Sequence, residues 1–358
     1  MAGSKIRTLI VDDSRLVRTI LRTTLLQHPN IEVVGDACDG IEALEKIAAL
    51  KPDVVTLDVE MPRLNGIGVL QRVVGKAPVG FVMVSTLTQA GARITFEALQ
   101  KGAFDYVAKP KTGGFAGMPA FRERLHEKVL GAAKARGRQR LVDAARGGGT
   151  TAPSLPPNKQ RGWAVAIGIS CGGPQTLMQM LPMFPSDFVP ILVTQHMPAQ
   201  FTPSFAKHLD DACAMDVREA VHLDRPRPGT IFIAPGSKHM KLVRQGADLY
   251  IHLDEGPRVS GHRPSVDVLF DSVARSCSPR AVGVIMTGMG ADGAVGMVRM
   301  RQAGAWTIAQ DESTSLVYGM PKEAVKAGGV DHVVPLQKIP LAISKLLERG
   351  VKRARAAV

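Results

Sequence analysis

Short apolar runs alternate with amphipathic stretches along most of this chain, and this alternation is the strongest constraint on its fold. In the first 110 residues the apolar runs are 8–11, 31–34, 54–57, 79–84 and 104–107. Ser14 and Asp39 each precede a stretch with apolar residues at helical spacing, so each is an expected helix N-cap. Strand-length runs separated by helices predict β-α units around a parallel sheet, because parallel strands need long crossover connections.

The alternation is interrupted once and then resumes. Residues 147–157 are rich in Gly and Pro, a composition that cannot bury a core and therefore indicates a linker. Beyond it, further apolar runs occur at 164–169, 190–194, 230–234, 248–252, 281–286 and 306–309. We therefore expect two α/β domains, the second being doubly wound with a mostly parallel sheet.

The expected domain limits follow from these patterns. We place the first domain at residues 1–125 and the second at 160–350. A helical stretch at 120–141 should close the first domain. The segment 126–159 is predicted to be a linker that begins as a helix, and 351–358 a basic tail. A length of 358 residues, of which 45% are hydrophobic and 22% charged, is typical of a soluble protein with two to three domains.

Cysteine spacing and hydropathy bear on the cellular compartment. The four cysteines lie far apart and form no C-x-x-C pair, which predicts reduced thiols in the cytoplasm rather than a zinc site or a disulfide framework. Two acids, Asp12 and Asp13, follow the first apolar run so closely that no signal peptide is expected. No apolar run approaches the roughly 18 residues that span a bilayer, so no membrane insertion is expected.

The formal net charge of +13 raises the question of nucleic-acid binding. Residues 122–161 carry a net charge of +7 and residues 345–358 a net charge of +4, so the excess is concentrated in two segments. Neither segment is interleaved with aromatic residues that could stack on bases. We therefore expect a solvated linker helix and tail and no nucleic-acid partner, while weak electrostatic docking to an acidic partner stays open.

Five polar residues follow successive apolar runs of the first half: Asp12, Asp13, Asp58, Ser85 and Lys109. Because the carboxyl ends of parallel strands meet at one edge of a sheet, these side chains should converge. Neighbouring carboxylates repel each other, and oxygen ligands suit Mg²⁺. The lysine offers a positive charge and the serine a hydroxyl to a phosphoryl group. An acidic turn is the alternative for any one pair, but five matched positions favour a site.

The first 125 residues resemble the receiver domain of two-component response regulators, which has a flavodoxin-like (βα)5 fold. The resemblance rests on four stretches, namely residues 9–14, 57–62, 83–85 and 106–110. It implies that Asp58 accepts a phosphoryl group from a histidine kinase. It also implies that Mg²⁺ is held by Asp12, Asp13, Asp58 and the carbonyl of Glu60.

The same resemblance implies a switch and one unusual peptide bond. Ser85 and Tyr106 match the pair whose hydroxyl and ring reorient after phosphorylation. In the family the bond that corresponds to Lys109-Pro110 is commonly cis, whereas only about 5% of bonds before proline are cis in folded proteins.

The second half contains a serine on a glycine turn, residues 168–172, which match the G-x-S-x-G pattern around Ser170. A serine nucleophile needs a base, and the base needs an orienting carboxylate. His196 follows an apolar run and is the first choice of base, and His239 is the second. Asp292 also follows a strand candidate, although a turn-forming Asp before glycine is the alternative. The order Ser, His, Asp differs from that of α/β-hydrolases, so we expect a different fold with a convergent triad.

Residues 160–345 resemble the catalytic domain of the chemotaxis protein-glutamate methylesterases. The supporting stretches are residues 195–198, 234–236, 262–267 and 318–321. The resemblance implies that Ser170 is the nucleophile, His196 the general base and acid, and Asp292 its orienter, with no cofactor in this domain. Met289 matches a position of oxyanion stabilisation, a role that we assign to its backbone N–H. Cys171 stands where the family usually has Thr; it is a second oxyanion candidate and a rival nucleophile.

Together these patterns predict a cytoplasmic, phosphorylation-activated serine hydrolase. It is expected to cleave glutamate methyl esters on methyl-accepting chemoreceptors, and to deamidate specific glutamines, for sensory adaptation. The alternative is a response regulator whose output domain is not catalytic and binds a partner or nucleic acid. The set of Ser170, His196 and Asp292, and the lack of a recognisable DNA-binding helix pair in the sequence, favour the hydrolase.

Overall fold

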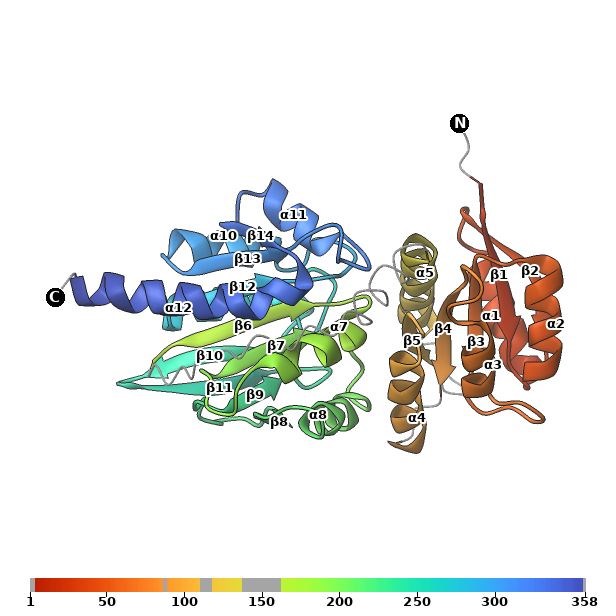
Figure 1. Ribbon diagram of the computed structural model, residues 1–358, viewed down its shortest axis with the longest axis horizontal. Helices are drawn as coiled ribbons and strands as arrows, with labels where there is room; N and C mark the ends of the chain where they lie inside the picture. Colours follow the sequence, from red (N-terminus) through yellow and green to blue (C-terminus); the bar gives the residue numbers. More distant parts are fainter. Residues whose placement is uncertain (1–3, 86–88, 110–117, 137–161, 357–358) are drawn as a thin grey trace. The chain divides into compact units, whose positions relative to one another are not determined.

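The chain forms two compact units, Met1–Gly147 and Gly148–Val358. The computed structural model describes residues 4–85, 89–109, 118–136 and 162–356 (Figure 1). The Gly- and Pro-rich part of the predicted linker lies outside these ranges. Each unit has its own sheet and is described by itself.

The first unit is built on a five-stranded sheet with the strand order β2-β1-β3-β4-β5. All four strand pairs are parallel, which confirms the predicted topology. The strands are β1 (Ile6–Val11), β2 (Ile31–Ala37), β3 (Val54–Asp58), β4 (Gly80–Ser85) and β5 (Asp105–Ala108). The helices are α1 (Arg15–Leu25), α2 (Gly40–Leu50), α3 (Gly66–Val73), α4 (Gln89–Gln100) and α5 (Met118–Ala135). In Figure 1 helix α1 packs beside α5, and α3 lies between α2 and α4.

Two helices of this unit begin at the predicted caps. The Ser14 hydroxyl accepts a hydrogen bond from the Val17 N–H at 3.5 Å. The Asp39 carboxylate accepts two, from Ile41 at 2.8 Å and Glu42 at 3.1 Å. Such caps satisfy N–H groups that the first turn of a helix leaves without partners. They fix where the chain leaves the sheet and therefore where the preceding acidic loop lies.

Helix α5 runs through the predicted limit between domain and linker at residues 125 and 126. Leu125, Val129 and Ala132 are fully buried, and Lys128 forms an ion pair of 2.8 Å with Asp105 of β5. The buried face therefore continues past residue 126 and packs on the first sheet. The helical start of segment 126–159 belongs to the first unit rather than to a separate linker.

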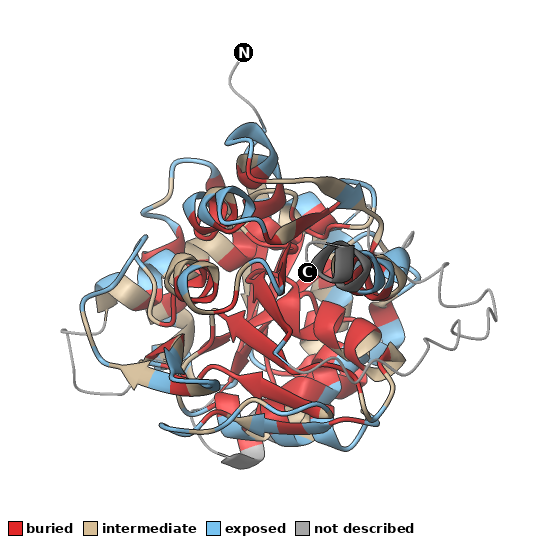
Figure 2. Cartoon of the chain, turned by 90° about the vertical axis from the view of Figure 1, so that its left-hand side faces the viewer, coloured by how far each residue is buried: buried red, intermediate tan, exposed pale blue. Residues whose placement is uncertain are grey.

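The second unit is built on a seven-stranded sheet with the order β14-β13-β12-β6-β7-β9-β8, in which every strand pair is parallel. Its strands are β6 (Ala164–Ile169), β7 (Ile191–Gln195), β8 (Asp216–Glu219), β9 (Thr230–Ile233), β12 (Ala281–Ile285), β13 (Trp306–Gln310) and β14 (His332–Val334). Its α-helices are α7 (Gly173–Met180), α8 (Thr202–Asp210), α9 (Val266–Ser276), α10 (Ala294–Gln302), α11 (Met320–Lys326) and α12 (Ile339–Ala356). The central strands are buried along their whole length, while helices show exposed outer faces (Figure 2). This is the expected doubly wound architecture.

A separate antiparallel hairpin corrects one expectation about this sheet. The run at 248–252 belongs to β11 (Asp248–Asp254), which pairs with β10 (His239–Gln245) and not with the main sheet. Strands β8, β10 and β14 were not predicted. Strand β14 has only three residues, and β8 and β10 carry charged residues, so their sequences lack the long apolar runs of central strands. Helix α9 packs against β10 and joins the hairpin to the core.

Helix α12 also crosses a predicted limit, because it continues to Ala356 and so includes most of the predicted basic tail, 351–358. Within the part of the chain that the structure describes, no helix is both long and apolar enough to cross a bilayer.

Candidate functional site

The strand ends of the first sheet bring the predicted acidic residues together. Asp12 follows β1, Asp58 is the last residue of β3, and Lys109 follows β5. Ligand atoms of Asp12, Asp13 and Asp58 all lie within 4.8 Å of one another. The Lys109 Nζ atom lies 2.8 Å from Asp12 Oδ2 and 2.7 Å from Asp58 Oδ2. Two of these three carboxylates, those of Asp12 and Asp58, thus share Lys109.

Burial gives this pocket an unusual electrostatic character. It raises the pKa of Asp58 to about 6, because the hydrogen bond from Lys109 offsets the loss of water only in part and Asp12 adds repulsion. Burial likewise raises the pKa of Asp12. Burial would lower the pKa of Lys109, but its bonds with the two carboxylates outweigh this and raise it. An excess of close carboxylate oxygens suits a divalent cation such as Mg²⁺.

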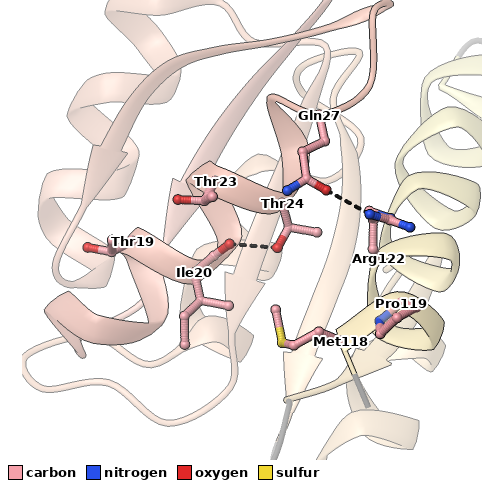
Figure 3. A pocket seen from close by; sticks show the side chains of 8 residues that line it. All are labelled: Thr19, Ile20, Thr23, Thr24, Gln27, Met118, Pro119 and Arg122. Atoms are coloured by element: carbon pink, nitrogen blue, oxygen red, sulfur yellow. Dashed lines mark hydrogen bonds between the residues drawn. The ribbon is translucent and has the colours of Figure 1, made fainter. Parts of the chain in front are cut away.

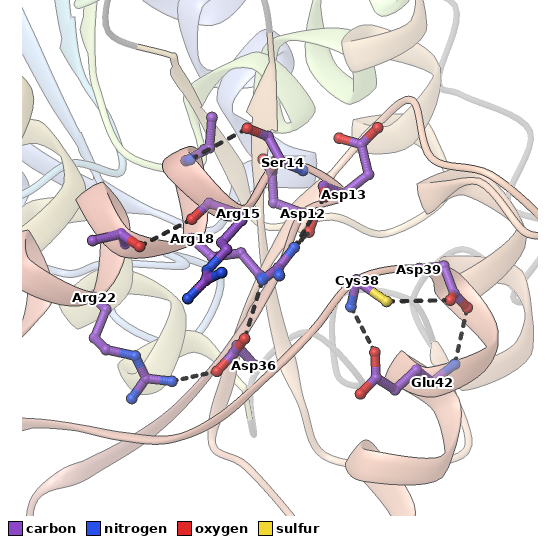
Figure 4. A network of polar contacts seen from close by, with 12 residues as sticks. Asp12, Asp13, Ser14, Arg15, Arg18, Arg22, Asp36, Cys38, Asp39 and Glu42 are labelled. Atoms are coloured by element: carbon purple, nitrogen blue, oxygen red, sulfur yellow. Dashed lines mark hydrogen bonds and ion pairs between the residues drawn. The ribbon is translucent and has the colours of Figure 1, made fainter.

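Backbone and side-chain bonds hold the first acidic loop rigidly (Figure 4). The Ser14 N–H donates to Asp12 Oδ1 at 3.0 Å. The Arg18 guanidinium donates to the carbonyls of Asp12 at 2.8 Å and Asp13 at 3.0 Å, and pairs with Asp36 at 3.1 Å. Helix α1 therefore anchors the loop through its first two turns.

Figure 4 also shows a second cluster of possible metal ligands, Cys38, Asp39 and Glu42. The Asp39 carboxylate caps α2 and pairs with Arg63. The Glu42 carboxylate accepts a hydrogen bond from the Cys38 N–H at 2.7 Å. Its pKa is lowered to about 2, mainly by the hydrogen bond from Lys46 and then by that from Cys38. These bonds account for the cluster as part of a helix cap.

The two predicted switch residues lie on adjacent strands. Ser85 ends β4, and its hydroxyl donates to the Gly91 carbonyl at 3.3 Å. Tyr106 of β5 is buried, with its ring packed edge-on against Phe96 of α4 at a centroid distance of 6.2 Å. Burial raises the pKa of this phenol. The ring therefore points into the unit in this structure.

Two further expectations on the receiver half stay predictions. Glu60 lies two residues beyond Asp58 with an exposed side chain, but its carbonyl as a metal ligand is not tested. The expected cis bond before Pro110 lies outside the described residues.

A pocket of about 350 Å³ lies between α1 and the start of α5 (Figure 3). It is lined by Thr19, Ile20, Thr23, Thr24, Gln27, Met118, Pro119 and Arg122. Gln27 and Arg122 meet across it at 3.1 Å. Its described lining has no carboxylate and lies on helices rather than at strand ends, so we assign it no chemistry.

A sharp turn after β6 presents the candidate nucleophile of the second unit. Ser170 follows the last residue of β6, and the chain then turns through Gly172, whose φ is +71°, into α7. The Gly173 N–H donates to the Ser170 carbonyl at 2.8 Å. A side chain at Gly173 would clash with Gln195 of the next strand. The glycine pattern is therefore required by the tight turn and by the close packing behind it.

His196 and Asp292 come to Ser170 from two other strand ends. His196 follows β7 and Asp292 lies in the loop between β12 and α10. The His196 Nδ1 atom lies 3.0 Å from Ser170 Oγ, and Nε2 lies 2.8 Å from Asp292 Oδ2. Because a carboxylate only accepts, Nε2 carries the proton and Nδ1 faces the serine as an acceptor. The structure thus brings all three predicted residues into one hydrogen-bonded row.

The N-terminal turn of α9 holds the Asp292 carboxylate. It accepts hydrogen bonds from Ser265 Oγ at 2.8 Å, Val266 N–H at 2.8 Å and Asp267 N–H at 3.0 Å. Burial alone would raise the pKa of Asp292, but His196 and then the N–H groups of Val266 and Asp267 lower it to about 2. The carboxylate is therefore fixed as an anion, as an orienting acid requires.

Two neighbours of this row were not predicted to belong to the site. Ser265 is one; its position as a polar residue before a helical stretch is the signal that could have found it. His262 is the other, and its ring stacks on His196 with a centroid distance of 3.7 Å and an interplanar angle of 8°. His239, the second choice of base, accepts from Ser265 and does not contact Ser170 in the described contacts.

The two oxyanion candidates flank the serine. A Cβ added to Gly288 would lie 2.9 Å from Ser170 Cβ, which places the start of the Met289 segment directly against the nucleophile. Cys171 is fully buried, and its carbonyl accepts from Thr287 at 2.9 Å. Ser170 is also buried, so burial does not separate the two candidates. The 3.0 Å contact between Ser170 Oγ and His196 Nδ1 favours Ser170 as the nucleophile.

Comparison with known proteins agrees with this division of the chain. Residues 8–114 match the response regulator receiver domain family and residues 165–343 match the CheB methylesterase family. A protein-glutamate methylesterase/protein-glutamine glutaminase of Cupriavidus pinatubonensis is 45% identical and covers 99% of this chain and 100% of its own length. One from Salmonella typhimurium is 46% identical and covers 94% of this chain and 95% of its own length.

A solved structure extends the agreement to the fold. The CheB methylesterase catalytic domain of Thermotoga maritima matches with a TM-score of 0.50 and 39% identity, covering 53% of this chain and 99% of that domain. Full-length relatives, both family matches and the fold thus agree, and the chain belongs to the protein-glutamate methylesterase/protein-glutamine glutaminase family, with a receiver domain joined to a CheB methylesterase domain.

Proposed function

We propose that this chain is a chemotaxis protein-glutamate methylesterase and protein-glutamine glutaminase whose activity is controlled by phosphorylation. The observation that carries this proposal is the hydrogen-bonded row in which His196 joins Ser170 to Asp292, a carboxyl group whose pKa is lowered to about 2. Family membership favours this hydrolase over a non-catalytic output domain.

The geometry supports covalent catalysis by the serine. Ser170 Oγ attacks the γ-ester carbonyl of a methylated glutamate while its proton moves to Nδ1 of His196. The resulting imidazolium is stabilised by Asp292. The proton then passes to the leaving methoxide, methanol departs, and an acyl-enzyme remains. Water attacks the acyl group as His196 takes its proton, and Ser170 leaves with that proton restored. With a glutamine substrate, ammonia leaves in place of methanol.

The oxyanion of each tetrahedral intermediate needs hydrogen-bond donors close to Ser170. We assign this role to the backbone N–H groups of Met289 and Cys171, which flank Ser170. A backbone donor does not depend on the side chain, so the cysteine at position 171 should be tolerated there.

The receiver half supplies the control. We propose that Asp58 accepts a phosphoryl group from a histidine kinase, and that Asp12, Asp13, Asp58 and the Glu60 carbonyl hold Mg²⁺. The ion, when bound, would neutralise the charge that develops on the phosphoryl oxygens. Lys109, already placed between Asp12 and Asp58, would pair with one of those oxygens.

The switch pair would then report the new charge. Ser85, at the end of β4, would turn its hydroxyl to the phosphoryl group, and the buried Tyr106 ring would repack. The substrates proposed are methyl-accepting chemoreceptors in the cytoplasm, where a histidine kinase is also available.

The test is release of methanol from methylated receptor fragments by the full chain, with and without Mg²⁺ and a small-molecule phosphodonor. We expect release that rises with the phosphodonor and is abolished by Ser170→Ala, by about 10⁶-fold as for other triad serines. Cys171→Ser is the matched control and should retain activity. Full esterase activity in the Ser170→Ala protein would sink the proposal. Release that ignores the phosphodonor would reject the control by Asp58.

A further inference from the structure

A second buried histidine lies at the far end of the hydrogen-bonded row that includes Ser170. His239, the first residue of β10, is only 2% exposed. Its Nδ1 atom lies 3.2 Å from the Ser265 backbone nitrogen, and its Nε2 atom lies 2.9 Å from the Pro257 carbonyl oxygen. The imidazole therefore joins Pro257, early in the loop between β11 and α9, to Ser265, the N-cap residue of α9.

The chemistry of these two partners fixes the tautomer. A backbone N–H can only donate, so Nδ1 of His239 must be unprotonated. A carbonyl can only accept, so Nε2 must carry the proton. His239 is thus a neutral imidazole with both nitrogens committed to backbone groups, and it has no nitrogen left to act as a base.

Ser265 transmits this constraint to the active site. Its N–H is held by His239, while its hydroxyl donates to Asp292 Oδ1 at 2.8 Å. The next two N–H groups, of Val266 and Asp267, also donate to Asp292. The position of the Ser265 backbone therefore sets the direction of three of the four donors around the carboxylate that orients His196.

We propose that His239 is a positioning residue for the esterase reaction, which acts through Ser265 to fix the Asp292 carboxylate. The inference rests on the proposed function for the reaction it affects. It assigns to His239 no contact with substrate. The hydrogen-bond acceptor at Nδ1 is the feature that matters, since it restrains Ser265 directly.

Substitution by Asn or Gln can test the two imidazole nitrogens of His239 one at a time. In His239→Asn the amide oxygen takes the place of Nδ1 and keeps an acceptor for the Ser265 N–H. In His239→Gln the amide nitrogen takes the place of Nε2 and keeps the donor to Pro257. His239→Leu fills the space and keeps neither. Second-layer partners of a catalytic group typically contribute about 10- to 100-fold to activity.

We therefore expect His239→Leu to lower kcat for methanol release by about 10- to 100-fold while KM stays within about twofold. His239→Asn should recover most of kcat, and His239→Gln should not. Ser272→Ala is the matched control, because the Ser272 hydroxyl accepts the Leu242 N–H of β10 at 2.9 Å but has no link to Asp292. It should perturb the same packing of β10 on α9 and leave kcat unchanged.

A second measurement, the covalent labelling of Ser170, tests the role of His239 without a receptor substrate. The rate at which a fluorophosphonate labels Ser170, followed by mass spectrometry, depends on the activated serine and not on receptor recognition. The variants should rank in the same order by labelling rate, with full final stoichiometry. If wild-type enzyme labels but releases no methanol, the proposed function fails and the positioning role can still be scored.

Three outcomes would overturn the positioning role. One is a wild-type kcat and labelling rate in His239→Leu. Another is an equal loss in the Asn and Gln variants. The last is a loss that Ser272→Ala reproduces, or that is matched by a lower labelling stoichiometry, because either result would mean that fewer molecules are folded rather than that Asp292 is misplaced.

Discussion

Asp58 and Asp292 occupy equivalent places in the two units, yet their environments push them in opposite directions. Each lies at or just beyond the carboxyl end of a buried parallel strand, and each side chain is at most 5% exposed. The pKa of Asp58 is raised to about 6, whereas that of Asp292 is lowered to about 2. Burial alone does not decide the charge of an acid; the partners do.

The partners differ in number and in kind. Asp292 accepts from a hydroxyl, two helix N–H groups and a histidine, so its negative charge is fully solvated by the protein. Asp58 shares Lys109 with Asp12 and stands beside a like charge. The first environment keeps a charge constant during turnover. The second has close carboxylate oxygens around one lysine, a set of ligands that suits a divalent cation.

Of the changes to these two acids, replacing Asp292 by an uncharged residue should have the larger effect on activity. Asp292→Asn places an amide N–H₂ among four donors, so the His196 Nε2–H loses its acceptor and the imidazole adopts the wrong tautomer for a base at Nδ1. We expect kcat for methanol release to fall by about 10⁴-fold, as in other triads. Steady-state kinetics measure this loss, with circular dichroism as the check on folding. A loss below tenfold would contradict the role of Asp292 as orienter.

Replacing Asp58 should have a smaller effect on activity, limited to the stimulation by the phosphodonor. Asp58→Asn removes the acceptor but lies outside the catalytic unit, so basal release should stay within about twofold. Stimulation by the phosphodonor, expected at about 5- to 150-fold for a typical coupling between sites, should vanish. Methanol release with and without phosphodonor measures both numbers. Stimulation that persists in Asp58→Asn would place the control elsewhere.

The raised pKa of Asp58 predicts that the affinity of the first unit for Mg²⁺ depends on pH. The ionisation of Asp292, whose pKa is lowered to about 2, should not change over the same pH range. Below about pH 6 a proton occupies Asp58 and competes with Mg²⁺. Affinity for Mg²⁺ should therefore fall by up to tenfold for each pH unit below 6 and level off above it, since one proton must leave. Calorimetric titration of the full chain with Mg²⁺ between pH 5 and pH 8 measures this slope. A flat profile would show that Asp58 is ionised throughout this range.

The strand-end positions of Asp58 and Asp292 could be predicted from the sequence, whereas their opposite pKa shifts could not. The parallel sheets and the convergence of Asp12, Asp58 and Lys109 were predicted, because apolar runs locate strands and strand ends share one edge. The row of Ser170, His196 and Asp292 was predicted by matching motifs to strand ends.

The surroundings of these residues were not predictable from spacing. Ser265 reaches Asp292 because α9 packs beside β12 and β6, and His239 reaches Ser265 because β10 packs on α9. Strand β10 has no apolar run that would reveal it in the sequence. The direction of a pKa shift depends on such tertiary neighbours. The linker and tail limits stay predictions, although α5 and α12 continue through residues 126 and 351, because the polar residues of these helices resemble solvated segments in sequence.

The smallest effect is expected at Asp267, an acid of the catalytic unit whose pKa is raised as that of Asp58 is. Burial raises its pKa, and Asp292 adds repulsion. Its Oδ1 accepts the Gly296 N–H at 2.8 Å and its Oδ2 accepts from Ser260 at 3.0 Å. Asp267→Asn can keep both contacts, since the amide oxygen accepts from Gly296 and the amide nitrogen donates to the Ser260 hydroxyl.

An acid whose pKa is raised by folding costs stability above its folded pKa, and that cost disappears below the unfolded value of 3.8. Asp267→Asn should therefore raise the free energy of unfolding at pH 7 and leave it unchanged near pH 3. Urea unfolding followed by circular dichroism at both values measures the difference. Because the Asp267 N–H still reaches Asp292, kcat should be unchanged. A stabilised variant with lower kcat would mean that the Asp267 charge itself helps to set the active site.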